Sequence, residues 1–98
     1  MPHSGAVADL LSPIEQELQG ERASALGIAG RKIEAALAAL ADPADPTPLD
    51  DKLDAAAMAV WYYIIVRESL RFYDHNAALR HYAVPDQVMA RVGVVKRR

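Results

Sequence analysis

The ten residues Ala41–Asp50, "ADPADPTPLD", separate two long segments whose apolar residues recur at helical intervals. Three prolines, Pro43, Pro46 and Pro48, remove backbone N–H donors and fix φ, so no helix continues through them. The segment 42–48 is therefore predicted to be the loop of a helical hairpin.

The segment before this loop is predicted to be one long helix. It opens with "SPIE", in which Ser12 is a suitable N-cap, Pro13 fits the first helical position and Glu15 completes a capping box. A helix of about 28 residues would be about 42 Å long at ~1.5 Å per residue. Its apolar residues form a slowly drifting stripe that consists of Ile14, Leu18, Ala25, Leu26, Ala29, Ile33, Ala36, Leu37 and Leu40.

The segment after the loop repeats the same start signal. Thr47 is placed to cap a helix, Pro48 to open it and Asp50 to occupy its third position. This second helix is expected to run from about Pro48 to Phe72. Its apolar stripe is too wide for one partner helix to cover, and it comprises Leu53, Ala57, Met58, Val60, Trp61, Tyr62, Tyr63, Ile64, Ile65 and Phe72.

Two shorter helices are predicted in the last quarter of the chain. Asp74 is the expected N-cap of a helix from His75 to about Tyr82, and Pro85 is expected to open another that stops at Gly93.

The whole chain, 1–98, is therefore predicted to be a single all-α domain, a long antiparallel hairpin with two short C-terminal helices. The end segments 1–11 and 94–98 are expected to be flexible.

Gly27 and Gly30 raise the question of a phosphate-binding loop. Such a loop follows a strand, and its Lys is followed by Ser or Thr, whereas here both flanks are helical and Lys32 precedes Ile33. Each glycine costs a helix about 1 kcal/mol relative to alanine. A packing contact should offset this cost. We therefore expect the patch of small residues around Gly27 and Gly30 to receive an aromatic cluster from the same chain or a second copy, namely Trp61, Tyr62 and Tyr63. The alternative is that the helix merely tolerates the glycines.

A hairpin of this length leaves apolar surface uncovered, so we expect a homodimer with a core that resembles a four-helix bundle. The residues predicted to pack between helices or between copies are Gly27, Gly30, Ile33, Leu37, Val60, Trp61, Ile64 and Ile65.

Charge is distributed unevenly along the chain. Residues 1–66 carry 4 Lys and Arg against 10 Asp and Glu, and residues 67–98 carry 7 against 3, so the net charges are −6 and +4. The basic segment is expected to pack on the acidic part of its own chain or of a second subunit, and an anionic partner is the alternative.

Glu68 lies four residues after Ile64 and four before Phe72, on the apolar side of its helix. A buried carboxylate must be paired or neutralised. We expect a structural ion pair with a basic side chain, for which the candidates are Arg67, Arg31 and Arg71. A catalytic carboxylate is the alternative.

The sequence gives only weak support for a metal, cofactor or catalytic site. The chain has no cysteine, and His3, His75 and His81 are not spaced three or four residues apart, so we assign no metal ligand, no cofactor and no catalytic residue.

The longest uncharged apolar run, Ala55–Val66, is 12 residues long, whereas about 20 are needed to cross a bilayer. The N-terminus lacks the pattern of a signal peptide. We expect a cytoplasmic protein that does not contact the membrane and is not an enzyme.

The segment 78–93, "ALRHYAVPDQVMARVG", has the outline of a helix-turn-helix. Its second helix offers Asp86, Gln87 and Arg91, and Asp86 lies where DNA phosphates would approach. A nucleic-acid-binding regulator is therefore the second hypothesis. The first is a non-catalytic, self-associating structural or interaction module.

The stretches "EQELQGERASALGIAGRKIEAALAAL", "AVWYYIIVRESL" and "HYAVPDQVMARVG" together resemble a family of small bacterial, mainly alphaproteobacterial, proteins of unknown function. The resemblance covers roughly Ile14 to Gly93 and implies no activity, substrate or cofactor. The family usually has Gln-Arg-Glu where this chain has Val66, Arg67 and Glu68. The matching positions are Glu17, Ala23, Ser24, Leu26, Gly27, Gly30, Glu34, Leu37, Trp61, Arg67, Glu68, Tyr82, Pro85 and Gly93.

Overall fold

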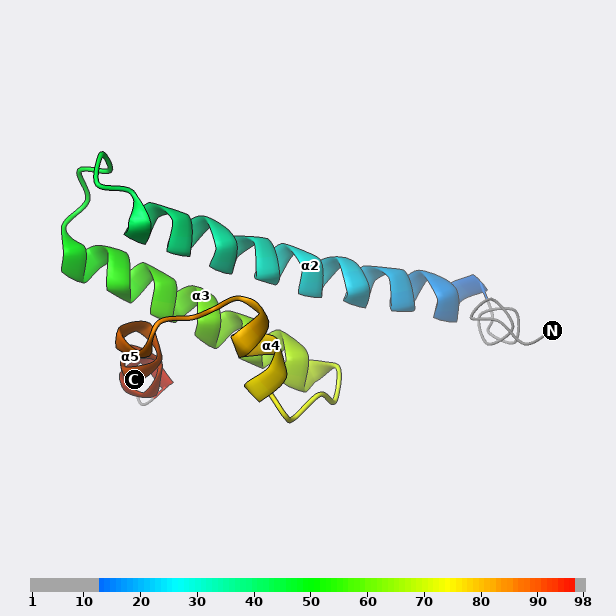
Figure 1. The fold of residues 1–98 in the computed structure, drawn as a ribbon. Helices are drawn as coiled ribbons and strands as arrows, with labels where there is room; N and C mark the ends of the chain where they lie inside the picture. Colours follow the sequence, from blue (N-terminus) through cyan, green and yellow to red (C-terminus); the bar gives the residue numbers. More distant parts are fainter. Residues whose placement is uncertain (1–12, 97–98) are drawn as a thin grey trace.

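The protein is an all-α chain of two long and two short helices in the computed structural model, which describes the backbone of residues 13–96 and the side chains of residues 24–93. The helices are α2 (Pro13–Ala41), α3 (Leu49–Ser69), α4 (Asn76–His81) and α5 (Asp86–Lys96) (Figure 1). The predicted hairpin with two short C-terminal helices is therefore confirmed. The expected N-cap Ser12 and the segment 1–11 lie outside the described residues.

The loop between α2 and α3 is held by two aspartate side chains. Asp42 Oδ1 accepts the backbone N–H of Ala44 at 2.9 Å, and Asp45 Oδ1 accepts that of Thr47 at 2.9 Å. The hydrogen bonds from the Thr47 backbone and side chain lower the pKa of the Asp45 carboxyl.

The predicted capping role of Thr47 is wrong. The N-cap of α3 is Pro48, and no side chain caps this helix. Asp45 engages both the backbone N–H and the side chain of Thr47, which turns that residue toward the loop.

The core lies between the two long helices and extends to α5. Ile33 of α2, Val60 of α3 and Val88 of α5 are fully buried. Burying an aliphatic side chain of this size contributes about 1.5–3 kcal/mol. Around these three residues are the other buried residues of the cluster, Ala29, Leu53, Ala56, Ala57, Tyr63, Ile64, Val66 and Val92.

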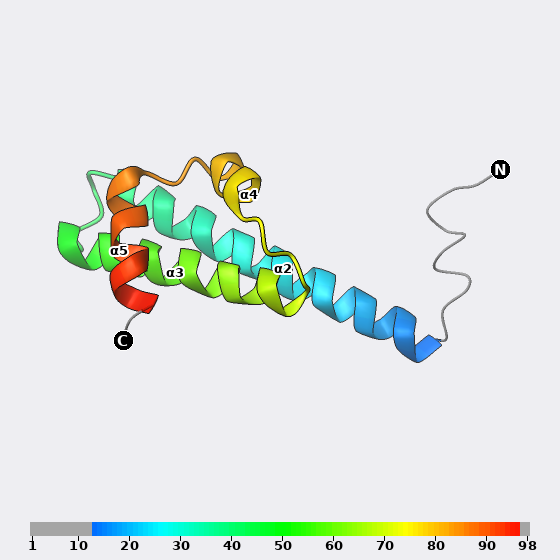
Figure 2. The same ribbon diagram turned by 90° about the horizontal axis from the view of Figure 1, so that it is seen from below.

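The C-terminal helices α4 and α5 cover one side of the hairpin, and none of the described helices covers the other side (Figures 1 and 2). The N-terminal part of α2 projects beyond the end of α3, so the molecule is elongated, with extents of 52 × 30 × 23 Å.

The ends of the short helices differ from the prediction. The N-cap of α4 is His75, while the Asp74 carboxylate accepts the N–H of Asn76 at 3.1 Å in the turn before the helix. Gly93 does not end α5, which continues to Lys96. This glycine has a negative φ, and an added Cβ there would meet no atom within 4 Å, so nothing forces the helix to stop. The segment 94–96, expected to be flexible, is therefore helical, and 97–98 lie outside the described residues.

Within residues 13–96, two residues other than glycine adopt the left-handed backbone conformation. Arg71 has φ 68° in the turn after α3, and Ala83 has φ 53° in the turn between α4 and α5. Outside glycine this conformation costs about 1–2 kcal/mol per residue. Both turns redirect the chain so that α4 and α5 fold back onto the hairpin (Figure 2).

Candidate interaction surface

The open side of α3 carries a continuous apolar seam. Ala55, Met58, Tyr62 and Ile65 follow one another at intervals of three and four residues, which places them on one face of the helix. Met58 is 48% exposed, and Tyr62 and Ile65 are each 41% exposed. Large apolar side chains exposed side by side commonly mark an interaction site.

The helix α2 extends this surface. Ile28 is 47% exposed, and one turn later the Lys32 ammonium lies 5.0 Å from the centre of the Tyr62 ring, a cation–π contact between the two helices. A shallow hollow of about 410 Å³ lies between the helices and is lined by Lys32, Ala36, Ala55, Met58, Ala59, Trp61 and Tyr62. We call the surface formed by Ile28, Lys32, Ala36, Ala55, Met58, Tyr62 and Ile65 the open face.

The covered face is the opposite side of the hairpin, where α4 and α5 pack. Gly30 is buried there, and a Cβ added to it would overlap the Tyr82 hydroxyl. Tyr82 packs edge-on against Tyr63, with ring centres 5.4 Å apart. Burial, and then the neighbouring Tyr63 and Glu34, raise the pKa of the Tyr82 hydroxyl.

The small patch thus receives an aromatic ring, but not the predicted one. Trp61 is half-buried against the core, Tyr62 is on the open face, and only Tyr63 of the expected cluster reaches Tyr82. Tyr82 reaches the site because the turn after α3, in which Arg71 is left-handed, folds α4 back onto the hairpin, which helical spacing alone does not indicate.

The other predicted packing residues lie inside the single chain. Ile33, Val60 and Ile64 are buried in the core, and Leu37 packs against it. Gly27 is half-buried, and the nearest side-chain atom to a Cβ added there is Arg31 Nη1 at 3.4 Å. Of the set, only Ile65 belongs to the open face.

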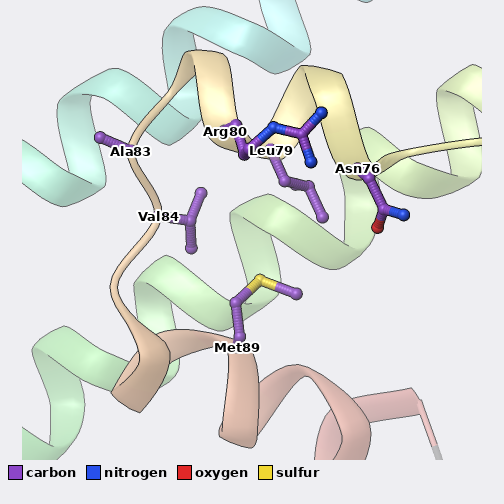
Figure 3. A pocket seen from close by; sticks show the side chains of 6 residues that line it. All are labelled: Asn76, Leu79, Arg80, Ala83, Val84 and Met89. Atoms are coloured by element: carbon purple, nitrogen blue, oxygen red, sulfur yellow. The ribbon is translucent and has the colours of Figure 1, made fainter.

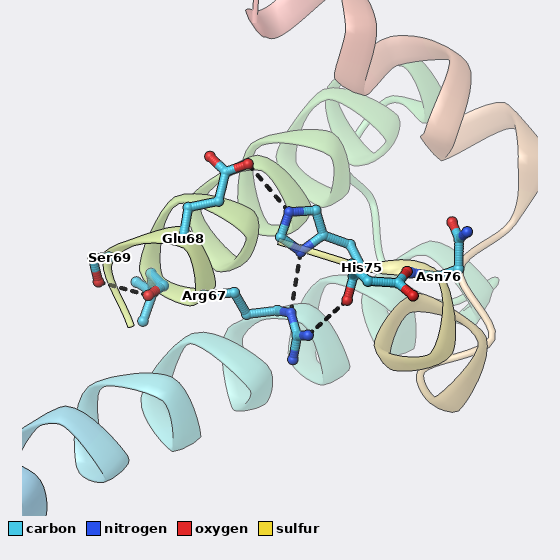
Figure 4. Close-up of polar contacts among 7 residues, drawn as sticks. Arg67, Glu68, Ser69, His75 and Asn76 are labelled. Carbon is cyan, nitrogen blue, oxygen red and sulfur yellow. Dashed lines mark hydrogen bonds and ion pairs between the residues drawn. The ribbon is translucent and has the colours of Figure 1, made fainter. Parts of the chain in front are cut away.

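Glu68 is not buried, contrary to the prediction. Its side chain is 45% exposed, and its Oε2 accepts the Nε2–H of His75 at 3.2 Å (Figure 4). His75 is held from its other side by Arg67, whose Nε donates to Nδ1 at 3.1 Å while its Nη2 donates to the Asp74 carbonyl at 2.8 Å. Since a guanidinium can only donate, the neutral imidazole carries its proton on Nε2.

This chain of contacts fixes the turn between α3 and α4. Arg31 and Arg71, the other proposed partners of Glu68, are exposed and form no ion pair with it. Because each nitrogen of the His75 ring is already engaged in the turn, the cluster is better suited to holding the backbone than to proton transfer.

A cluster of ion pairs attaches α5 to α3. The residues that form it were not predicted from the sequence. Arg91 Nη1 bonds to Asp54 Oδ1 and Nη2 to Asp50 Oδ1, each at 2.8 Å. The hydrogen bonds to Asp54 and then to Asp50 raise the pKa of Arg91 further above its usual range. Asp50 and Asp54 are four residues apart and share one face of α3, which together with the charge asymmetry of the chain is consistent with a basic partner.

A second hollow, of about 370 Å³, lies between α4 and α5 (Figure 3). Leu79, Val84 and Met89 form its apolar wall, and Asn76 and Arg80 stand at its edge. Apart from Asn76, its lining falls within the segment 78–93 that resembles a helix-turn-helix, but the Arg91 guanidinium of that segment is held by α3.

Within the described part of the chain, no group of three His, Cys, Asp or Glu side chains is arranged to hold a metal ion. Nor is any helix in the described part long and apolar enough to span a bilayer. No curated protein and no solved structure matches the chain. A family model matches residues 2–98, nearly the whole sequence. The chain therefore belongs to the family of unknown function DUF6665.

Proposed function

We propose that this chain is a non-catalytic, self-associating helical module whose open face binds a second copy. The observation that carries the proposal is the apolar seam of Met58, Tyr62 and Ile65, which stays 41–48% exposed after the chain's own C-terminal helices have packed on the opposite side. A soluble monomer rarely exposes such side chains side by side unless they bind something.

The open face can form the centre of an interface. Its α3 residues run from Ala55 to Ile65, about 15 Å along the helix, and it is two helices wide, about 20 Å. This area of roughly 300 Å² is less than the ~800 Å² per partner that specific complexes bury, so flanking residues of both helices must add to the interface. Pairing two such faces places four helices around one apolar layer, as in a helix bundle.

The second hypothesis, a nucleic-acid-binding regulator using 78–93, is less well supported. Gln87 of α5 is exposed, but Arg91, the other side chain that the sequence offered for base recognition, is engaged by Asp50 and Asp54. Both acids would also repel a phosphate backbone approaching that end of α5. Titration of a random-sequence duplex at low salt tests this hypothesis, and salt-sensitive binding would support it.

Sedimentation equilibrium of the full chain at low micromolar concentration tests self-association. We expect the mass of two 10.7 kDa chains for the natural sequence. Met58→Lys should shift the equilibrium to the monomer, because the lysine places a charge at the centre of the interface while suiting an exposed helical position.

Tyr73→Ser is the matched control, since Tyr73 is 66% exposed but lies in the turn between α3 and α4, outside the open face. Both variants are first checked by circular dichroism for an unchanged helix content. A monomeric natural chain, or a Met58→Lys variant that stays dimeric, would refute the proposal.

A further inference from the structure

We infer that the two copies pair antiparallel, about a two-fold axis between Ala55 and Met58, so that Lys32 of each copy faces Asp51 of the other. This inference rests on the proposed function and specifies its geometry. It follows from three properties of the open face: the spacing of its seam, its relief and the position of its charges.

The seam has the spacing of a coiled-coil interface. Positions 51, 55, 58, 62 and 65 of α3 follow the alternating steps of four and three residues that bring the a and d positions of a heptad to one line. A seam of this kind packs against another helix rather than against a loop or an irregular surface. Asp51 is exposed at one end of it and Tyr62 lies near the other.

The relief of the face is self-complementary. Met58 protrudes, with 48% of its surface exposed, and it borders the hollow whose floor includes the small side chains Ala36, Ala55 and Ala59. A two-fold axis between Ala55 and Met58 places Met58 of each copy opposite Ala55 of the other. Each methionine then enters the hollow of its partner, as a knob enters a hole.

The charges of the face determine the direction of pairing. Lys32 lies over Tyr62, eleven residues from Asp51 along α3, which corresponds to about 16 Å. The midpoint between positions 51 and 62 coincides with the midpoint between 55 and 58, so one axis satisfies both the relief and the charges. A parallel arrangement would instead place Lys32 against Lys32 and Asp51 against Asp51.

Both charged groups are available for this contact. Among the described residues, neither Lys32 nor Asp51 takes part in an ion pair within the chain. The remaining acids of the first turns of α3, Asp50 and Asp54, are turned toward Arg91 on the covered side. Within the part of the chain that the structure describes, Lys32 on the open face and Asp51 at the end of its seam therefore give each copy one cation and one anion, and the antiparallel arrangement forms two symmetric ion pairs.

Charge reversal tests the arrangement. Lys32→Asp and Asp51→Lys should each weaken dimerisation about tenfold in low salt, because each creates two like-charge contacts. The double variant Lys32→Asp/Asp51→Lys should return to within about threefold of the natural dissociation constant, and the differences should shrink in 1 M salt. If the double variant is as weak as the product of the two single changes, the pairing is wrong.

Thiol crosslinking tests the geometry directly, since the natural chain contains no cysteine. A mixture of Asp51→Cys and Tyr62→Cys chains, treated with a short bis-maleimide, should give a crosslinked heterodimer. Each variant alone should not crosslink, because its two thiols are about 16 Å apart along the helices.

Crosslinking of each variant with itself would indicate parallel pairing and overturn the inference, while the proposed dimer would stand. If the natural chain is monomeric in sedimentation, the proposed function and the inference fail together. The two failures are therefore distinguishable.

Discussion

Both sides of the α2–α3 hairpin carry apolar residues, but these residues are buried on one side and exposed on the other. On the covered face, Gly30 lies against Tyr82, and Val88 of α5 is fully buried. On the open face, Met58 and Tyr62 remain 48% and 41% exposed. Among the described residues, those after α3 cover one side of the hairpin and none covers the other. The comparison separates the side on which the chain completes its own core from the side on which it leaves large apolar residues exposed.

Truncating one isoleucine on each side should show the largest contrast. Ile33→Ala removes a fully buried side chain and is expected to cost about 2–5 kcal/mol of the free energy of unfolding. Ile28→Ala, on the same helix but 47% exposed, is expected to cost under about 0.5 kcal/mol in the monomer.

Urea unfolding at low protein concentration measures both values. Equal losses would mean that the open face is packed within the chain. An Ile28→Ala loss that grows with protein concentration would instead support burial of Ile28 in the dimer.

The two glycines should respond in opposite directions. Gly30→Ala places a methyl group against the Tyr82 hydroxyl, and displacing that ring is expected to cost about 1–3 kcal/mol despite the better helix propensity. Gly27→Ala meets only the flexible end of Arg31 and should stabilise the chain by up to about 1 kcal/mol.

Melting temperatures of the two variants test this contrast. In the double variant Gly30→Ala/Tyr82→Phe, which lacks the hydroxyl, part of the lost stability should return. If Gly30→Ala alone raises the melting temperature, the close contact with Tyr82 is refuted.

The polar contacts that close the covered face should contribute less. Glu68→Gln is expected to destabilise the chain by under about 1 kcal/mol, because the side chain is 45% exposed and the amide oxygen can still accept from His75. Chemical denaturation of this variant measures the effect. A loss of about 3–5 kcal/mol would restore the buried ion pair that the sequence suggested.

The smallest expected effect appears at alkaline pH. Burial raises the pKa of Tyr82 above its value in the unfolded chain, which is about 10. The unfolded chain therefore loses this proton first, so the stabilisation is complete below about pH 10 and is lost as the pH rises through the higher folded value. Tyr82→Phe should reduce this alkaline loss of stability, whereas Tyr62→Phe on the open face keeps Tyr82 and should keep the loss. Identical pH profiles for both variants would contradict the assignment.

The sequence predicted the helices better than their contacts. Three prolines between two periodic segments are enough to predict the hairpin, because backbone sterics act locally. The helices α2 and α3 end within three residues of the expected positions, and both short helices are present. The width of the stripe around Trp61 also indicated that one partner helix could not cover α3, and the structure has α2 and α5 against it.

The contacts between residues far apart in the sequence could not be predicted, because they depend on how the chain folds back onto the hairpin after α3. The contact between Gly30 and Tyr82 joins residues 52 positions apart and requires the turns at Arg71 and Ala83. Glu68 was expected to be buried because it shares a helix side with Ile64, yet the side chain reaches outward to His75. Periodicity assigns a residue to a side of a helix, but it does not determine where a long polar side chain ends.

The left-handed turns at Arg71 and Ala83 also affect how the molecule opens. A helix as short as the six-residue α4 does not persist in water without tertiary contacts, and both of its flanking turns use a disfavoured conformation. The segment from Arg71 to the end of α5 should therefore detach as a unit, at a lower free energy than the unfolding of the hairpin. Amide hydrogens of α4 should exchange with solvent well before those at the centre of α3. During each such opening, Gly30 and its neighbours on α2 meet water, and the hairpin briefly presents apolar surface on both sides.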